Sequence, residues 1–119
     1  MDEEEGARRI SKQVLSQLGY EPELAKNGAE TIELYKESMD SGQPFDLVIL
    51  NLTVKAGMGG KDTVKKLQEL YPQVKAIVSS GYSDDPVMTN FTVYGFTGIL
   101  PKPNTKKELI EMLKKITKE

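Results

Sequence analysis

The chain has 119 residues, and we expect residues 1–119 to form one domain. Its 16 Lys and Arg against 18 Asp and Glu give a formal net charge of −2, so we expect no basic surface of the kind that nucleic acid binding needs. The absence of Cys and His excludes disulfides, thiol and imidazole catalysis, the usual zinc sites and a phosphohistidine donor. Every apolar run is shorter than the roughly 18 residues that cross a bilayer, and the acidic start, residues 1–5, is unlike a signal peptide. We therefore expect a cytoplasmic protein that does not enter the membrane.

The first half of the chain alternates between helix and strand patterns. Apolar residues at helical spacing predict helices at residues 4–18 and 28–41. Residues 20–25 alternate like a strand, and Pro22, which has no backbone N–H, confines this strand to the edge of a sheet. The apolar run 45–50 is typical of a strand that is buried on both faces.

The second half continues the alternation. We expect a glycine-rich loop at residues 51–60, a helix at 61–71 and a strand at 75–79. A poorly patterned helix at 85–94, a strand at 98–100 and a last helix at 106–118 follow. Thr105 and Glu108 form a capping box in front of the last helix. Strands that alternate with helices in this way predict a parallel sheet covered on both faces, and ligands of such sheets bind at the carboxyl ends of the strands.

Polar residues follow three of the predicted strands, at Asn51, Ser80 and Lys102, and an acidic pair, Asp2 and Glu3, precedes the first helix. This pattern resembles the response-regulator receiver domain of two-component systems over essentially the whole chain. It is most similar to the receivers of hybrid sensor histidine kinases, in the segments 45–50, 57–61 and 76–88. The resemblance implies a flavodoxin-like (CheY-like) fold, with a parallel sheet between two layers of helices.

The resemblance also places Asn51 where the family has its phosphoacceptor aspartate. An amide oxygen is a poor nucleophile, so an aspartyl phosphate cannot form at Asn51. Two further positions depart from the family, because Lys55 replaces a usual proline and Ile99 stands where an aromatic switch residue is common. The sequence therefore predicts a receiver that is degenerate at its phosphoacceptor, a position that is also among the metal ligands of the family.

Other residues match the family's site one by one. Asp2 and Glu3 match the acidic pair that holds Mg²⁺, and Thr53 matches the residue that adds its backbone carbonyl; hard oxygen ligands suit this ion. Ser80 and Lys102 match the hydroxyl and the amine that contact the phosphoryl group. With an amide at the acceptor position, we expect this metal site to be vestigial, with weak Mg²⁺ binding at most and no other cofactor.

The family's first strand, an apolar segment before the acidic pair, has no counterpart in the sequence. That strand is central in the family, and without it the backbone of its neighbours lacks partners. We expect the first strand to be missing or replaced, so that the sheet is altered, closed by a homodimer, or completed by a strand from another chain.

Three functions follow from these residues. The first is a phosphorelay signalling module that cannot be phosphorylated at the usual position, Asn51, and acts by binding a sensor histidine kinase or another response regulator. The second is an ordinary phospho-accepting response regulator seen as an Asp-to-Asn variant, against which Lys55, Ile99 and the missing strand count. The third is a small flavodoxin-like enzyme with Ser80 as nucleophile and Lys102 as base, but Ser80 lacks the glycine two residues earlier that a nucleophile elbow has. We expect no enzymatic activity.

Overall fold

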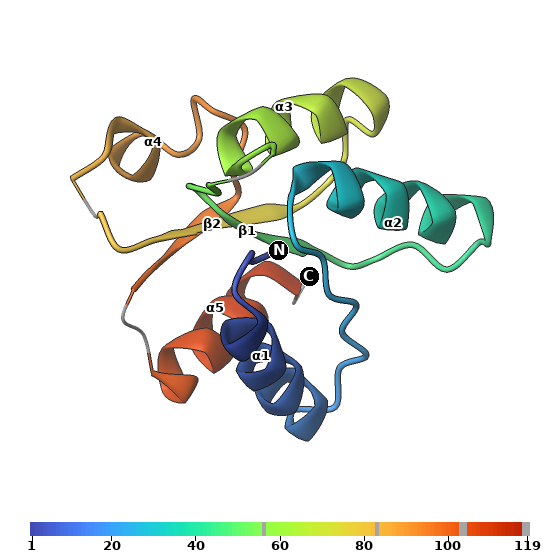
Figure 1. Cartoon of the computed structure of the whole chain (residues 1–119), viewed down its shortest axis with the longest axis horizontal. Coiled ribbons are helices and arrows are strands. Elements are labelled where there is room, and N and C mark those ends of the chain that lie inside the picture. The colour runs from blue at the N-terminus through green and yellow to red at the C-terminus, as the bar shows by residue number, and fades with distance from the viewer. Residues whose placement is uncertain (56, 83, 103–104, 118–119) are drawn as a thin grey trace.

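The structure, a computed structural model, describes residues 1–55, 57–82, 84–102 and 105–117. Within these residues, one parallel sheet is built in the order β1 (Val48–Asn51), β2 (Ala76–Ser80) and β3 (Gly98–Pro101). The register sets Leu50 opposite Val78 and Val78 opposite Ile99. Helices lie on both sides of the sheet, which confirms the predicted three-layer α/β architecture (Figure 1).

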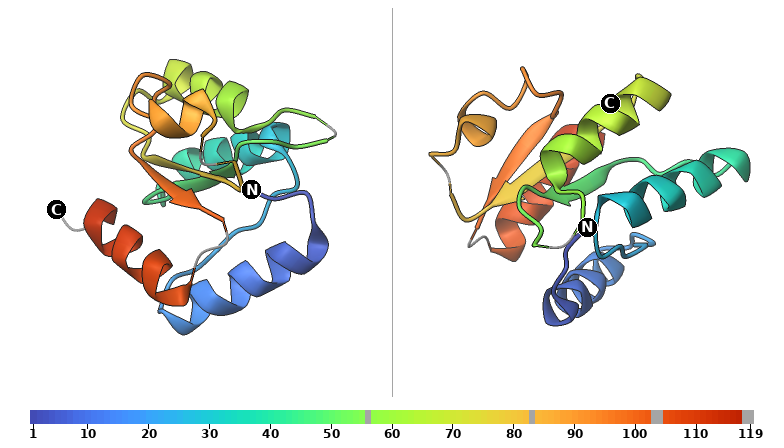
Figure 2. Two further views of the ribbon diagram at one scale, coloured as in Figure 1. Left: turned by 90° about the vertical axis from the view of Figure 1, so that its left-hand side faces the viewer. Right: turned by 45° about the horizontal axis from the view of Figure 1, so that its top comes forward.

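The described residues form five helices: α1 (Glu5–Gln17), α2 (Gly28–Asp40), α3 (Gly60–Leu70), α4 (Pro86–Thr89) and α5 (Lys106–Thr117). Helices α2, α3 and α4 lie on one side of the sheet, and α1 and α5 lie on the other (Figure 1, Figure 2). The predicted capping box is confirmed, since Glu108 N–H donates to Thr105 Oγ1 at 3.1 Å and Thr105 N–H donates to Glu108 Oε1 at 2.8 Å. Each helix in the described part of the chain is too short or too polar to cross a bilayer.

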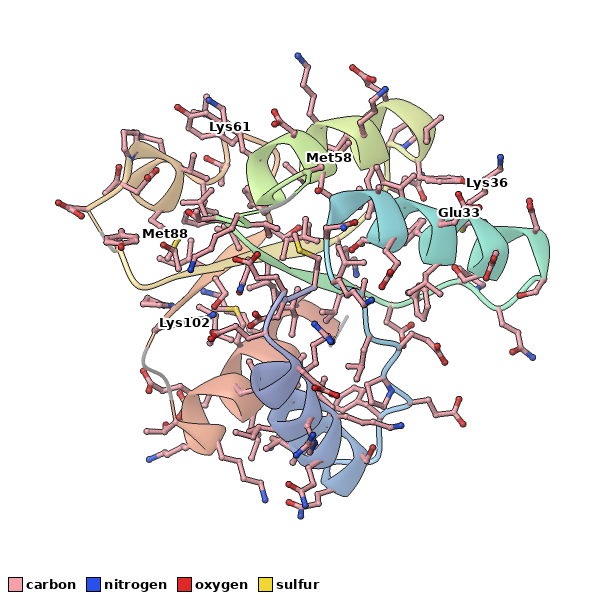
Figure 3. The ribbon with its side chains drawn as sticks, in the orientation of Figure 1. Glu33, Lys36, Met58, Lys61, Met88 and Lys102 are labelled. Carbon is pink, nitrogen blue, oxygen red and sulfur yellow. The ribbon has the colours of Figure 1, made fainter. Side chains whose placement is uncertain are left out.

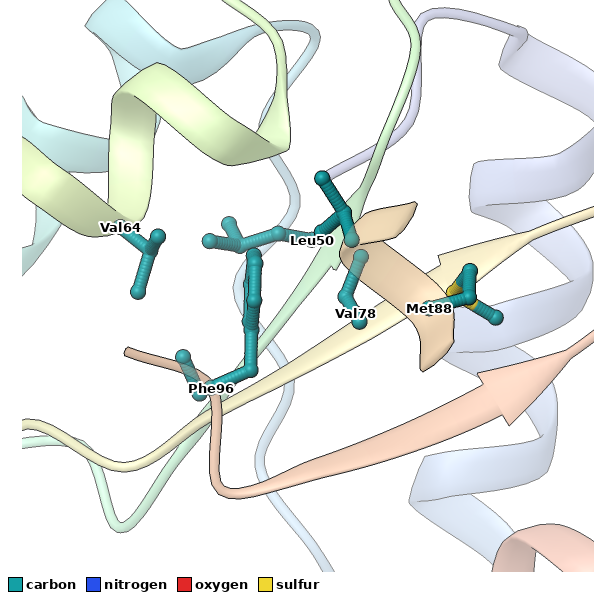
Figure 4. Close-up of a cluster of buried hydrophobic side chains, with 7 residues drawn as sticks. Leu50, Val64, Val78, Met88 and Phe96 are labelled. Atoms are coloured by element: carbon teal, nitrogen blue, oxygen red, sulfur yellow. The ribbon is translucent and has the colours of Figure 1, made fainter. Parts of the chain in front are cut away.

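Buried apolar clusters on both faces of the sheet hold the layers together. Between the sheet and the α3–α4 layer, a buried cluster includes Leu50, Val64, Val78, Met88 and Phe96 (Figure 4). On the other face, a smaller cluster joins the sheet to α5 through Ile77, Leu100 and Ile116. Adjacent residues of β2 therefore point into different cores, as the alternation of a strand requires.

Three of the predicted elements are wrong in extent or in kind. Residues 20–25 are not a strand, residues 45–47 lie outside β1, and α4 ends at Thr89 where a helix to residue 94 was expected. Among the described residues the sheet ends at β1, so residues 20–25 have no neighbouring strand with which to pair. The third follows from the weak apolar pattern of its segment, which continues in turns.

Met1 and Asp2 lie between β1 and residues 20–25 and bond both. The Met1 amino group donates to Ile49 C=O at 2.7 Å, and Asn51 N–H donates to Met1 C=O at 3.2 Å. On the opposite side, Asp2 N–H donates to Ala25 C=O at 2.9 Å. These bonds fix the acidic pair beside the carboxyl end of β1.

Candidate functional site

The candidate site lies where the three parallel strands end. Asn51 is the last residue of β1, Ser80 is the last residue of β2, and Lys102 follows β3 directly. A small cavity of about 150 Å³ opens between these ends. Its walls bring together four of the residues that the sequence predicted, Asn51, Thr53, Ser80 and Lys102, together with Ser79, Gly81 and Tyr82.

The backbone around Asn51 is closely packed. Its N–H bonds Met1, and a Cβ placed on Gly60 would lie only 2.6 Å from Asn51 C=O. Gly59 is the N-cap of α3, and a Cβ placed on it would likewise lie 2.7 Å from the C=O oxygen of Leu52. The two glycines therefore allow α3 to begin directly against the loop after β1. The sequence analysis placed both glycines in the glycine-rich loop 51–60 and did not predict this contact, although adjacent glycines before a helix are a usable signal.

Ser80 has a hydroxyl that can still donate. Ser80 Oγ accepts the N–H of Tyr82 at 3.0 Å, and its C=O accepts the N–H of Lys102 at 2.8 Å. A hydroxyl that accepts one bond keeps its own proton for another partner. In contrast, the hydroxyl of Ser79 is used within the sheet, since it donates to Leu100 C=O at 3.0 Å. Of the two serines, only Ser80 has a hydroxyl proton that no acceptor takes up among the described residues.

The acidic pair reaches the site from the N-terminus. Asp2 Oδ2 lies 3.5 Å from Lys102 Nζ. The Asp2 side chain is largely buried, whereas that of Lys102, which is labelled in Figure 3, is 41% exposed. The other oxygen of Asp2 accepts the N–H of Glu4 at 3.1 Å. The arrangement brings Asp2 and Lys102 together, as the resemblance predicted for the two sides of one site.

Glu3 is directed away from the cavity, toward the loop that follows β1. Both carboxylate oxygens of Glu3 accept the backbone N–H of Lys55, each at 3.0 Å. Among the described residues, no three Asp or Glu side chains come close enough to hold a metal ion. The available donors are the Asp2 carboxylate, which is paired with the Lys102 ammonium, the Glu3 carboxylate, which accepts a backbone N–H, and the neutral amide of Asn51. This set fits Mg²⁺ poorly, and weak binding stays a prediction.

The amino group of Met1 also belongs to this region, and sequence reasoning did not identify it. The pKa of this group is lowered from 8.0 to about 6, mainly by burial; the charge of Asp2 opposes this shift, and the charges of Lys102 and Arg8 add to it. Nothing in the sequence pattern signals this, because the effect depends on how closely the first residue packs against β1.

A family model now decides the assignment. The model of the response regulator receiver domain matches residues 1–114. The chain belongs to this family. The chain is similar to two kinds of protein. It is 28% identical over 116 residues to the sensor kinase CckA of Brucella abortus, and this match covers 98% of the chain and 12% of that kinase. It is 29% identical over 112 residues to the chemotaxis protein CheY of Thermotoga maritima, covering 93% of the chain and 88% of CheY.

Solved receiver structures share the fold. The CheX–CheY–BeF₃–Mg²⁺ complex from Borrelia burgdorferi contains a chain that superposes with a TM-score of 0.88 at 17% identity, over 99% of this chain and 86% of that one. A receiver domain protein from Methanospirillum hungatei gives a TM-score of 0.82 at 24% identity, over 96% and 86%. The flavodoxin-like fold and the membership in two-component signalling are therefore confirmed, while the chain spans only about an eighth of CckA.

Proposed function

We propose that this receiver cannot take a phosphoryl group at the usual acceptor position and acts in two-component signalling by binding a partner protein. The observation that carries the proposal is the position of Asn51, at the end of β1 and in the wall of the same cavity as Ser80 and Lys102. The groups that would contact a phosphoryl group are gathered there. The carboxylate that would attack it is replaced by an amide.

A second position, Lys55, supports the proposal that this receiver is degenerate at more than one position, rather than an ordinary receiver with a single Asp-to-Asn change. Lys55 stands where the family usually has proline, and its backbone N–H holds the Glu3 carboxylate. A proline has no N–H and could not make this bond. The residue that replaces the proline thus turns one of the two acidic side chains away from the cavity, and a single Asp-to-Asn change does not account for this.

The contacts of Ser80 and Lys102 argue against an enzyme. The Ser80 hydroxyl accepts a bond from Tyr82 N–H, and the Lys102 ammonium is paired with Asp2. Among the described residues, no hydrogen bond joins the Ser80 hydroxyl to the Lys102 amine. The two groups therefore lack the arrangement of an activated nucleophile and its base.

The partner that we propose is a cytoplasmic sensor histidine kinase or another response regulator. Among the similar proteins, CckA is a sensor kinase, LuxN is a sensor kinase/phosphatase, and the solved CheX–CheY complex pairs a receiver with a second protein. The net charge of −2 supports a protein partner over nucleic acid.

An NMR titration with beryllofluoride and Mg²⁺ tests the proposal. The reagent mimics a phosphoryl group on an acceptor carboxylate, so the amide signals of Ser80 and Lys102 should stay in place in the unmodified domain. The same signals should move in Asn51→Asp, which serves as the matched control. Equal movement in both proteins would show that the acceptor position is not what prevents phosphorylation.

A further inference from the structure

The cavity at the strand ends has room for a small ligand. Its volume is about 150 Å³, and a water molecule takes up about 30 Å³ of the liquid, so an ion with four oxygen atoms fits. Its walls are formed by residues 51, 53, 79–82 and 102, so they do not depend on the part of the chain that precedes β1. We call this cavity the end cavity.

The walls of the end cavity carry hydrogen-bond donors that no protein group uses. The Ser80 hydroxyl accepts a bond from Tyr82 N–H and keeps its own proton. The backbone N–H groups of Thr53 and Gly81 have no acceptor among the described residues. The side-chain amide of Asn51 adds two more protons. A ligand that accepts several hydrogen bonds at once therefore suits this cavity.

The charges around the end cavity favour an anion. Lys102 is in its walls, and none of the described residues that line it is Asp or Glu. Asp2 lies outside the walls and pairs with Lys102 at 3.5 Å. An ammonium has three protons, and an ion pair with an exposed lysine is weak, so Lys102 keeps protons for an anion in the cavity.

Asn51 determines which form of anion the cavity can hold. A carboxylate at this position would lie in the wall and repel a free dianion, because like charges a few ångströms apart disfavour each other. The amide removes this repulsion and offers a donor instead. The residue that prevents a covalent phosphoryl group therefore favours a free oxyanion in its place.

We propose that the end cavity binds a free tetrahedral oxyanion, of which inorganic phosphate is the simplest, without forming a covalent bond. The Lys102 ammonium and the Ser80 hydroxyl hold its oxygens, and the Asn51 amide donates where an acceptor carboxylate would repel. The inference rests on the proposed function, because it requires the amide at Asn51, and it names the ligand class of that site. Occupancy of the cavity then follows the concentration of the free ion and not a phosphotransfer reaction.

An NMR titration of the unmodified 119-residue chain with sodium phosphate tests the proposal. It is carried out at pH 8, without Mg²⁺, and at an ionic strength that sodium chloride keeps constant. The amide signals of Thr53, Gly81 and Lys102 should move together along one saturation curve with a millimolar midpoint. Sodium sulfate, an ion of the same shape and charge, should move the same signals.

Two substitutions should act in opposite directions. Asn51→Asp places a carboxylate in the wall and should weaken phosphate binding at least tenfold, whereas Asp2→Asn removes the competing partner of Lys102 and should tighten it at least threefold. Asn90→Asp makes the first charge change at an exposed position outside the walls, and Glu33→Gln makes the second on α2, which Figure 3 shows apart from Lys102. Both controls should leave the midpoint within twofold of its original value.

The amino terminus provides a further control. A chain acetylated at this end should bind phosphate equally, because Met1 is not in the walls of the end cavity. Weaker binding after acetylation would place the ion at the Met1 amino group and overturn the proposal.

Three other results would overturn it. The first is no movement of the three amide signals at tens of millimolar phosphate, and the second is an equal or tighter midpoint in Asn51→Asp. The third is the same effect of Asp2→Asn and Glu33→Gln. Failure of the proposed function has a different readout, a covalent phosphoryl adduct on the unmodified domain that persists after dialysis, so the two failures are distinguishable.

Discussion

The ammonium of Lys102 pairs with the carboxylate of Asp2 at 3.5 Å, so the amine that follows β3 meets the acid that precedes α1 across the end of the sheet. In this receiver the lysine therefore has an acidic partner although Asn51 carries no charge. The pair joins the two chain segments that flank the small cavity, and it sets the charge that any ligand there would meet.

Removing this amine should change the stability of the domain only slightly. Lys102 is 41% exposed, and exposed ion pairs contribute about 0 to 1 kcal/mol. We expect Lys102→Met to lower the free energy of unfolding by less than about 1 kcal/mol, measured by urea denaturation at low salt, with a smaller difference in high salt. Lys65→Met, at an exposed position of α3, is the control. A loss of several kcal/mol would mean that the pair is buried in solution.

Magnesium binding should be weak and should improve when the acceptor carboxylate is restored. A unit charge within a few ångströms of a dication contributes on the order of 1–4 kcal/mol near a surface, so Asn51→Asp should tighten binding by roughly five- to a thousandfold in calorimetry. Asn90→Asp, which adds the same charge at an exposed position, should have no such effect. Micromolar affinity in the unmodified domain would contradict this expectation.

The Glu3–Lys55 contact predicts a further gain. Lys55→Pro removes the N–H that holds Glu3, which frees this carboxylate to turn toward the cavity. In the Asn51→Asp background, Lys55→Pro should therefore tighten Mg²⁺ binding beyond the single variant. Unchanged affinity in the double variant would show that Glu3 does not reach the metal position.

Crowding at the start of α3 should make Gly60 intolerant of a side chain. A Cβ at this position would lie 2.6 Å from Asn51 C=O, and the contact is with backbone, which cannot easily move. We expect Gly60→Ala to lower the free energy of unfolding by about 1–3 kcal/mol, as overpacking does. Gly6→Ala, in α1 with nothing within 4 Å, should be neutral or stabilising. Equal effects of the two changes would refute the close approach of α3.

Stability should rise between about pH 6 and pH 8. Burial lowers the pKa of the Met1 amino group from 8.0 to about 6, so in this window the unfolded chain binds more protons than the folded chain, and folding is favoured as pH increases. Below about pH 6 the folded chain carries the full free-energy cost of protonating the buried amine, which is at most on the order of 3 kcal/mol. The chain has no histidine to add to this slope. Denaturation at pH 5.5 and 8.5 measures it, and an N-terminally acetylated chain should show a flatter profile.

Local patterns predicted most of the fold correctly because local physics determines those elements. The capping residues Thr105 and Glu108 act through neighbours in sequence, and so does the apolar run ending at Leu50, of which only Leu50 is fully buried. Residues 20–25 failed for the opposite reason. Their alternation is compatible with a strand, but a strand also needs a neighbour with free backbone groups, and among the described residues only the N–H of Asp2 bonds this segment from the side of the sheet.

The candidate site shows the same division. Asn51, Ser80 and Lys102 could be predicted because residues after parallel strands must meet at one edge of the sheet. The orientation of Glu3 could not, since it depends on a bond to Lys55, 52 positions away in sequence. The packing of Gly60 on Asn51 and the burial of the Met1 amino group are likewise tertiary contacts that leave no periodic trace in the sequence.

The most direct test of the central claim is intact-mass spectrometry after incubation with acetyl phosphate and Mg²⁺. The unmodified domain should show no acid-labile phosphoryl adduct, because the amide of Asn51 cannot attack phosphorus. Asn51→Asp should gain one phosphoryl group, which would show that Ser80, Lys102 and Asp2 still support the reaction. A stoichiometric acid-labile adduct on the unmodified domain would contradict the account.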